Sequence, residues 1–124
     1  MPVEITADHA NRLIRLELEG ALDTREMIDG VEEVLRLVGG RSGYDFFSDH
    51  RKITQPATAE QIKAVLARLS QDGDVVRGSK FAAVVGQGAS YGMMRLMAVH
   101  ATDIGIEVGV FWTVEEAMTF LGRT

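Results

Sequence analysis

The sequence contains no cysteine, and this absence excludes several kinds of chemistry. Disulfide bonds, thiolate nucleophiles and zinc sites with cysteine ligands are all ruled out. No apolar run approaches the roughly 20 residues that span a bilayer, so we expect no membrane insertion. Proline is scarce too, with only Pro2 and Pro56, and no low-complexity tract divides the 124 residues. Residues 1–124 therefore read as a single domain.

Basic residues are too few to suggest a nucleic-acid surface. Lysine and arginine number 13 against 18 acidic residues, which gives a net charge of −5. Nucleic-acid-binding domains carry a basic excess or stripe, and anionic membrane surfaces attract basic segments, so we expect neither partner. The opening Met1-Pro2-Val3-Glu4 has neither the basic segment nor the apolar core of a secretory signal, which leaves the cytoplasm as the expected location.

Two kinds of hydrophobic periodicity follow one another along the chain. Alternation or short apolar runs predict strands near residues 3–6, 13–19, 44–48, 81–85 and 106–111. Apolar residues at helical spacing predict helices near 24–38, 58–69, 90–102 and 114–121. Asp23, Thr58 and Thr113 each stand three residues before a Glu or Gln, the spacing of a capping box. The predicted order is therefore ββαβαβαβα.

This order predicts an α/β fold with a five-stranded mixed sheet. Right-handed connections make the sheet mainly parallel, with the first strand antiparallel to the second. The strands at 13–19 and 106–111 alternate cleanly, so one face of each should meet water or a partner. The run at 81–85 is apolar throughout and suits a central strand. We therefore expect helices mostly on one face, and an open face or edge that allows a homodimer.

Three segments carry a resemblance to a known superfamily. They are Asp49-His50-Arg51, Gly92-Met93-Met94-Arg95-Leu96-Met97, and the stretch from Val110 to Leu121 that contains Phe111-Trp112-Thr113 and Glu115-Glu116-Ala117. The order of elements and the chain length resemble the STAS-like fold of SpoIIAA-type anti-sigma factor antagonists. The C-terminal half is most similar to the uncharacterised bacterial STAS/SEC14-like family.

The resemblance implies two different uses of the fold. Regulatory members carry a phosphorylatable Ser or Thr after the third strand, in an Asp-Ser-Ser/Thr-Gly type segment. The matching Asp49-His50-Arg51-Lys52 lacks both the hydroxyl and the glycine, which argues against a phosphoswitch here. A SEC14-like resemblance instead implies an apolar ligand pocket.

Seven residues near the ends of the parallel strands are candidates for contacting a ligand or partner. They are Asp49, His50, Arg51, Gly88, Ser90, Arg95 and Trp112. Open α/β sheets place ligands at the carboxyl ends of their strands, where these residues should lie. A histidine such as His50 can titrate near neutrality, and Arg51 with Lys52 suits an anion. The alternative is a solvated loop.

Arg95 and Trp112 also allow two interpretations each. Arg95 is placed to reach Asp49 or a ligand, or is an ordinary surface arginine. Trp112, the only tryptophan, covers a pocket or an interface, or is a core or rim residue.

A glycine-rich stretch from Gly86 to Gly92 follows one strand and opens a helix. Its backbone amides suit a phosphate, but Tyr91 occupies the place of the third glycine in a dinucleotide fingerprint. A plain turn between strand and helix explains the same residues.

No residue set amounts to a catalytic signature, and His9 and His100 lack the spacing of metal ligands. We therefore expect a non-enzymatic binding or regulatory module without cofactor or metal, which contacts a protein or small ligand at the carboxyl edge of the sheet. The alternative is a carrier of a small apolar or amphipathic, lipid-like ligand, with Met93, Met94, Met97 and Trp112 lining its pocket. The least favoured function is an enzyme that holds a phosphate ester at residues 86–92.

Overall fold

Strands and helices alternate along the chain, as its periodicity predicts. The computed structural model describes residues 2–123. The strands are β1 (Val3–Asp8), β2 (Leu13–Gly20), β3 (Asp45–Ile53), β4 (Lys80–Val84) and β5 (Glu107–Phe111). The helices are α1 (Thr24–Val38), α2 (Ala59–Ser70), α3 (Gly73–Val76), α4 (Gly88–Ala101) and α5 (Val114–Leu121), with a short 3-10 turn at Thr102–Ile104. Within the described part of the chain, no helix is long and apolar enough to cross a bilayer.

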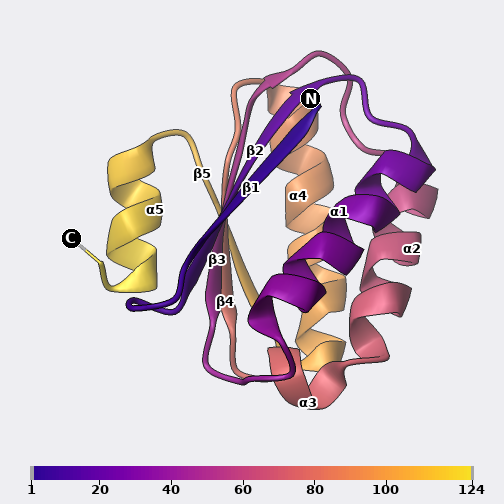
Figure 1. Cartoon of the computed structure of the whole chain (residues 1–124). Coiled ribbons are helices and arrows are strands. Elements are labelled where there is room, and N and C mark those ends of the chain that lie inside the picture. The colour runs from indigo at the N-terminus through magenta and orange to yellow at the C-terminus, as the bar shows by residue number, and fades with distance from the viewer. Residues whose placement is uncertain (1, 124) are drawn as a thin grey trace.

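The five strands lie in one sheet in the order of the sequence, β1-β2-β3-β4-β5. β1 is antiparallel to β2, and the other neighbours are parallel, as predicted. Each new parallel strand joins the same side, so right-handed connections carry α1, α2 and α4 over one face. Figure 1 shows these three helices together on that face and α5 alone on the other. The prediction of helices mostly on one face is confirmed.

The position of α5 explains why the run at residues 81–85, which includes most of β4, is apolar throughout. Ala82 and Val84 pack in a cluster with Ala117 and Leu121 of α5. Ala83 and Val85, which alternate with them, pack on the opposite face against α2 and α4. All four β4-region residues have exposures of 1% or less, so this strand is covered on both faces.

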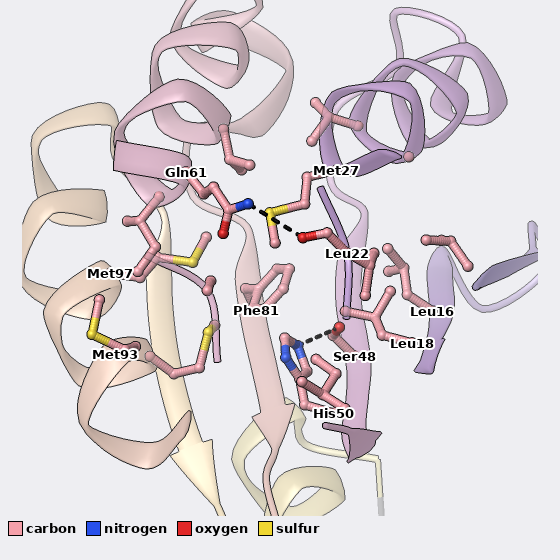
Figure 2. A pocket seen from close by; sticks show the side chains of 18 of the residues that line it. Leu16, Leu18, Leu22, Met27, Ser48, His50, Gln61, Phe81, Met93 and Met97 are labelled. Carbon is pink, nitrogen blue, oxygen red and sulfur yellow. Dashed lines mark hydrogen bonds between the residues drawn. The ribbon is translucent and has the colours of Figure 1, made fainter. Parts of the chain in front are cut away.

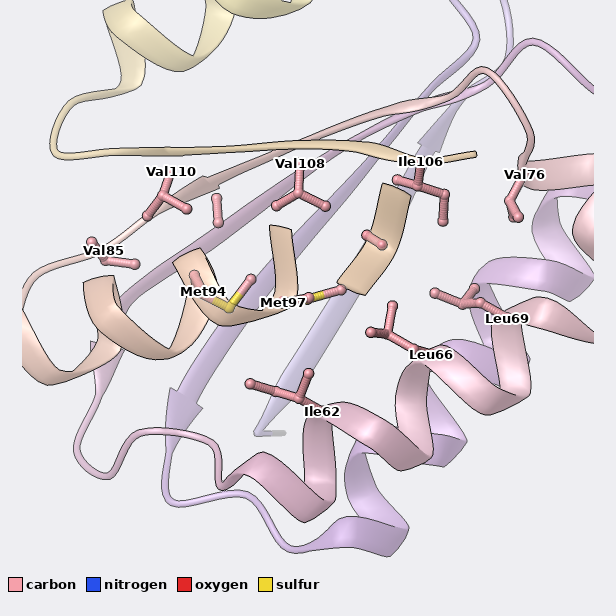
Figure 3. Close-up of a cluster of buried hydrophobic side chains, with 12 residues drawn as sticks. Ile62, Leu66, Leu69, Val76, Val85, Met94, Met97, Ile106, Val108 and Val110 are labelled. Carbon is pink, nitrogen blue, oxygen red and sulfur yellow. The ribbon is translucent and has the colours of Figure 1, made fainter. Parts of the chain in front are cut away.

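The largest hydrophobic cluster joins α2 and α4 to the β4–β5 side of the sheet (Figure 3). Its buried members are Ile62, Leu66, Leu69, Val76, Ala83, Val85, Met94, Met97, Ala101, Ile106, Val108 and Val110. A separate cluster under α1 contains Ile14, Val34, Val38, Tyr44 and Phe46. The helix layer is thus anchored at β4–β5 and under the C-terminal half of α1.

The structure differs from the predicted elements in two places. The strand predicted at 44–48 continues through residues 49–52, which are part of β3 rather than a solvated loop and pair with β2 as far as Ile53 beyond an irregularity between Glu17 and Glu19. β4 pairs with β3 only as far as Asp49. The last residues of β3 therefore have a strand on one side only, and polar side chains persist there. The segment between the helix predicted at 58–69 and the strand predicted at 81–85 also contains the short helix α3, which the periodicity does not predict.

Candidate functional site

An open pocket of about 140 Å³ lies between the sheet and the layer formed by α1, α2 and α4. Side chains from six elements point into it (Figure 2): Leu16 and Leu18 from β2, Ser48 and His50 from β3, Phe81 from β4, Met27 from α1, Gln61 from α2, and Met93 and Met97 from α4. The exposed walls are almost entirely apolar. An engineered cavity of about 150 Å³ with similar walls admits benzene, so this space suits a small apolar group.

A missing side chain helps to keep the pocket open. Gly30 lies in the middle of α1 and lines the pocket, although glycine lowers helix stability by about 1 kcal/mol relative to alanine. A Cβ at Gly30 would meet only a methyl of Val3, at 3.6 Å. The backbone therefore has room for a side chain at this position, and glycine leaves that room to the pocket.

β3 brings a pair of polar side chains to the pocket. Ser48 is 1% exposed, and its hydroxyl lies 2.7 Å from Nε2 of His50. Nδ1 of His50 has no hydrogen-bond partner among residues 2–123. Burial lowers the pKa of His50 to about 4, against the opposing effect of the nearby Asp49 charge. His50 keeps some exposure because it faces the open pocket, yet its ring is neutral at pH 7.

Asp49 and Arg51 lie on the opposite face of β3, because successive strand residues alternate. One oxygen of Asp49 accepts hydrogen bonds from the backbone N–H and Nε of Arg51, both at 3.0 Å. The other accepts from the Arg51 guanidinium at 2.7 Å, and these bonds lower the pKa of Asp49. The candidates Asp49, His50 and Arg51 are therefore divided between two faces.

The structure places Trp112 outside the pocket, against the carrier hypothesis, and Arg95 on the surface, which is one of its two interpretations. Trp112 does not line the pocket; it is 49% exposed at the end of β5 and stacks on Tyr91, with ring centroids 5.1 Å apart and planes 2° apart. Arg95 does not pair with Asp49, whose carboxylate is occupied by Arg51. Arg95 is exposed on α4 instead.

Lys52 also differs from its expected role beside an anion. It shares a surface hollow with Glu4, Glu17 and Glu19, so its surroundings are acidic. Negative charges at this position disfavour an anion rather than attract one.

The glycine-rich stretch is mostly helical. α4 begins at Gly88, and Gly92 lies inside it on an exposed surface. Gly86 is explained by close packing, because a Cβ there would lie 3.3 Å from the backbone oxygen of Arg51. Gly88 is exposed at the carboxyl edge, whereas Ser90 is 4% exposed and lines the pocket.

The sequence predicted part of the pocket. Met93, Met94 and Met97 line it, as the carrier hypothesis expects. The contributions of Met27 and Phe81 were missed, because each fits the periodicity of an ordinary core residue. The sequence feature that could have indicated the pocket is Gly30, a glycine inside a strong helical pattern. Across residues 2–123, no group of three histidine or acidic side chains is placed to ligate a metal ion.

Comparison with known proteins identifies the architecture. Neither a family model nor a curated protein matches the sequence. Among solved structures, the chain is similar to an uncharacterized protein of the DUF3478 family with a SpoIIAA-like fold from Shewanella loihica PV-4. The TM-score is 0.61 and the identity 14%, over 96% of this chain and 91% of that one. At this identity the likeness concerns the fold alone, and this chain has the SpoIIAA-like fold.

Proposed function

We propose that this protein is a non-enzymatic binding module that takes a small apolar or amphipathic molecule into the pocket beneath α1, α2 and α4. The observation that carries the proposal is the open space of about 140 Å³ with almost wholly apolar walls. An apolar cavity with a few polar groups is the usual form of a small-molecule site. The volume favours a ligand with an apolar body near the size of benzene.

The walls suit a ligand of variable shape. Met27, Met93, Met94 and Met97 all line the pocket. Methionine is unbranched and polarizable, so it adapts to different apolar partners at little energetic cost. A module of this kind binds by apolar contact and selects its ligand by the few polar groups at the walls.

The arrangement of Ser48 and His50 supports binding rather than catalysis. A serine nucleophile needs an exposed hydroxyl and a base that a third group orients. Ser48 is 1% exposed, and the neighbouring Asp49 carboxylate bonds to Arg51 on the other face. His50 therefore lacks the carboxylate that would hold its ring for proton transfer.

Filling the pocket from α1 tests the proposal. We expect Gly30→Leu to weaken the binding of octanol about tenfold or more, since excluding two methylene groups costs about 1.6 kcal/mol. Gly92→Leu is the matched control, because Gly92 is also helical but exposed, with nothing within 4 Å of its Cβ position. Isothermal titration calorimetry gives the affinities, and native mass spectrometry of the purified protein shows any retained ligand. Equal octanol affinities for both variants would contradict the proposal.

A second candidate function is contact with a protein at the carboxyl edge of the sheet. The favouring observation is the stack of Tyr91 on Trp112, which leaves half of a large aromatic surface exposed. Exposed Trp and Tyr are enriched at the centres of protein interfaces. Among residues 2–123, Leu96 and Val99 of α4 are the other exposed large hydrophobic residues, and they offer a surface for the homodimer that we predict.

The two candidates respond to different substitutions. Trp112→Ser removes the edge aromatic without touching the pocket, and Gly30→Leu fills the pocket without touching the edge. If a partner or second copy binds at the edge, Trp112→Ser will weaken association by about 2 kcal/mol, the scale of an interface hot spot. Sedimentation velocity and pull-down measure this association. Association that is unchanged by Trp112→Ser would argue against the edge.

A further inference from the structure

Ser90 carries two hydrogen-bond donors that the protein leaves unused. It is the third residue of α4, is 4% exposed and lines the pocket. No partner for its hydroxyl occurs among residues 2–123, and its backbone N–H lies in the first turn, where helix geometry supplies none. The hydroxyl is not fully enclosed by protein and reaches the open pocket. Both donors are therefore available to a molecule in the pocket.

The other long helices satisfy the corresponding N–H with a side chain. The third-residue amide donates to Asp23 in α1, to Thr58 in α2 and to Thr113 in α5. In α4 the preceding residue is Gln87, whose side chain instead donates to the backbone oxygen of Ile53 at 3.1 Å. The first turn of α4 therefore has free N–H groups and the positive end of a helix dipole, which together favour an anion.

His50 adds a third polar group to the same pocket. Its Nε2 is bonded to Ser48, so Nδ1 is the nitrogen left for a ligand. When the Ser48 hydroxyl donates to Nε2, Nδ1 carries the ring proton and acts as a donor. The neutral ring then contributes a hydrogen bond without introducing a buried charge.

One acidic residue lines the pocket and opposes this preference. Glu26 of α1 is a pocket residue, but its carboxylate accepts a hydrogen bond from the backbone N–H of Asp23 at 3.0 Å. It is thus held in the capping box of its own helix. Arg51 does not compensate, because it pairs with Asp49 on the other face. The unused donors of Ser90 favour an anionic ligand, whereas the carboxylate of Glu26 favours a cationic one. The charge of the ligand therefore depends on which of these two residues contributes more to binding.

We infer that the ligand is a small amphipathic carboxylate, held through its carboxylate by the N–H and hydroxyl of Ser90 with help from His50, and through its apolar body by the methionine-lined pocket. This assignment rests on the proposed function and names its ligand class. Two or three donors converging on one anionic group, inside apolar walls, form stronger hydrogen bonds than the same groups in water.

Three probes with one apolar chain and different head groups test the inference: octanoate, octanol and octylammonium. Calorimetry at pH 7 should give octanoate at least a tenfold higher affinity than octanol, and octylammonium the weakest. Ser90→Ala should lower octanoate affinity about tenfold and leave octanol affinity unchanged, since one hydrogen bond to a charged group is lost. Because the hydroxyl has no hydrogen-bond partner among residues 2–123, this substitution removes no hydrogen bond within that part of the protein.

Ser79→Ala is the matched control. Ser79 is also buried, at 2% exposure, and its hydroxyl also lacks a partner, but it lies outside the pocket. It should leave both affinities unchanged. Octanol binding as tightly as octanoate, or octylammonium binding best, would overturn the carboxylate assignment while the proposed function stands. Failure of all three probes to bind would overturn the proposed function itself.

Discussion

Replacing either Phe46 or Phe47 by alanine will lower the free energy of unfolding by about 3–5 kcal/mol. The two residues are neighbours in β3, and each is 5% exposed. Phe46 packs in the cluster under α1 and lines the pocket, whereas Phe47 packs in the cluster under α5. Urea denaturation measures both losses. A loss below about 1 kcal/mol at either residue would contradict the packing of that face.

Ligand binding will separate the two variants. Phe46→Ala extends the pocket, so it should improve the affinity for dodecanol relative to octanol, while Phe47→Ala leaves that ratio unchanged. Because the stability loss approaches the total stability of some domains, Phe46→Leu and Phe47→Leu provide milder versions of the same pair. An equal change in the affinity ratio for both residues would show that the pocket is not the binding site.

Lowering the pH from 7 to 5 will remove about 2 kcal/mol of stability through His50 alone. Its pKa is about 4 in the folded protein against an ordinary value of 6.5, so the unfolded chain binds more protons between these values. The contribution is present above pH 6.5 and is lost as the pH falls toward 4. Asp49, whose pKa is lowered from 3.8, titrates below this window.

Urea denaturation at several pH values checks this prediction. His50→Gln removes the titrating ring and keeps an amide near Ser48, so its stability should depend much less on pH between 7 and 5. His100→Gln is the control, because His100 is an exposed residue near the end of α4. If His50→Gln and the unmodified protein show the same pH dependence, the ring is not held neutral in the pocket.

The fold was predictable because local signals agree with the tertiary structure. Asp23, Thr58 and Thr113 all cap helices as their spacing predicts. The alternation of Arg15 and Glu17 with Leu16 correctly predicts a face of β2 without a helix. Such patterns report on burial, and burial decides the layers of a small α/β domain.

The pocket was less predictable, because it depends on how three helices approach the sheet. His50 and Asp49 are adjacent in sequence, yet strand alternation sends them to opposite faces. Residues 49–52 were interpreted as a loop because they are charged or polar. The end of β3 has a neighbouring strand on one side only, so its sequence carries no apolar pattern that would indicate a strand. Ser90 was predicted as a contact residue from its place after β4, and its burial in the pocket emerges only from the packing of α4.

Methionine methyl resonances provide the most direct test of the central claim that this pocket binds a small apolar molecule. Met27, Met93, Met94 and Met97 line the pocket, whereas Met118 belongs to α5 and packs on the other side of the sheet. Titration with octanoate should shift the four pocket methyl signals with one common affinity and leave the Met118 signal in place. Unchanged pocket signals at saturating octanoate, or a Met118 shift as large as theirs, would contradict the account.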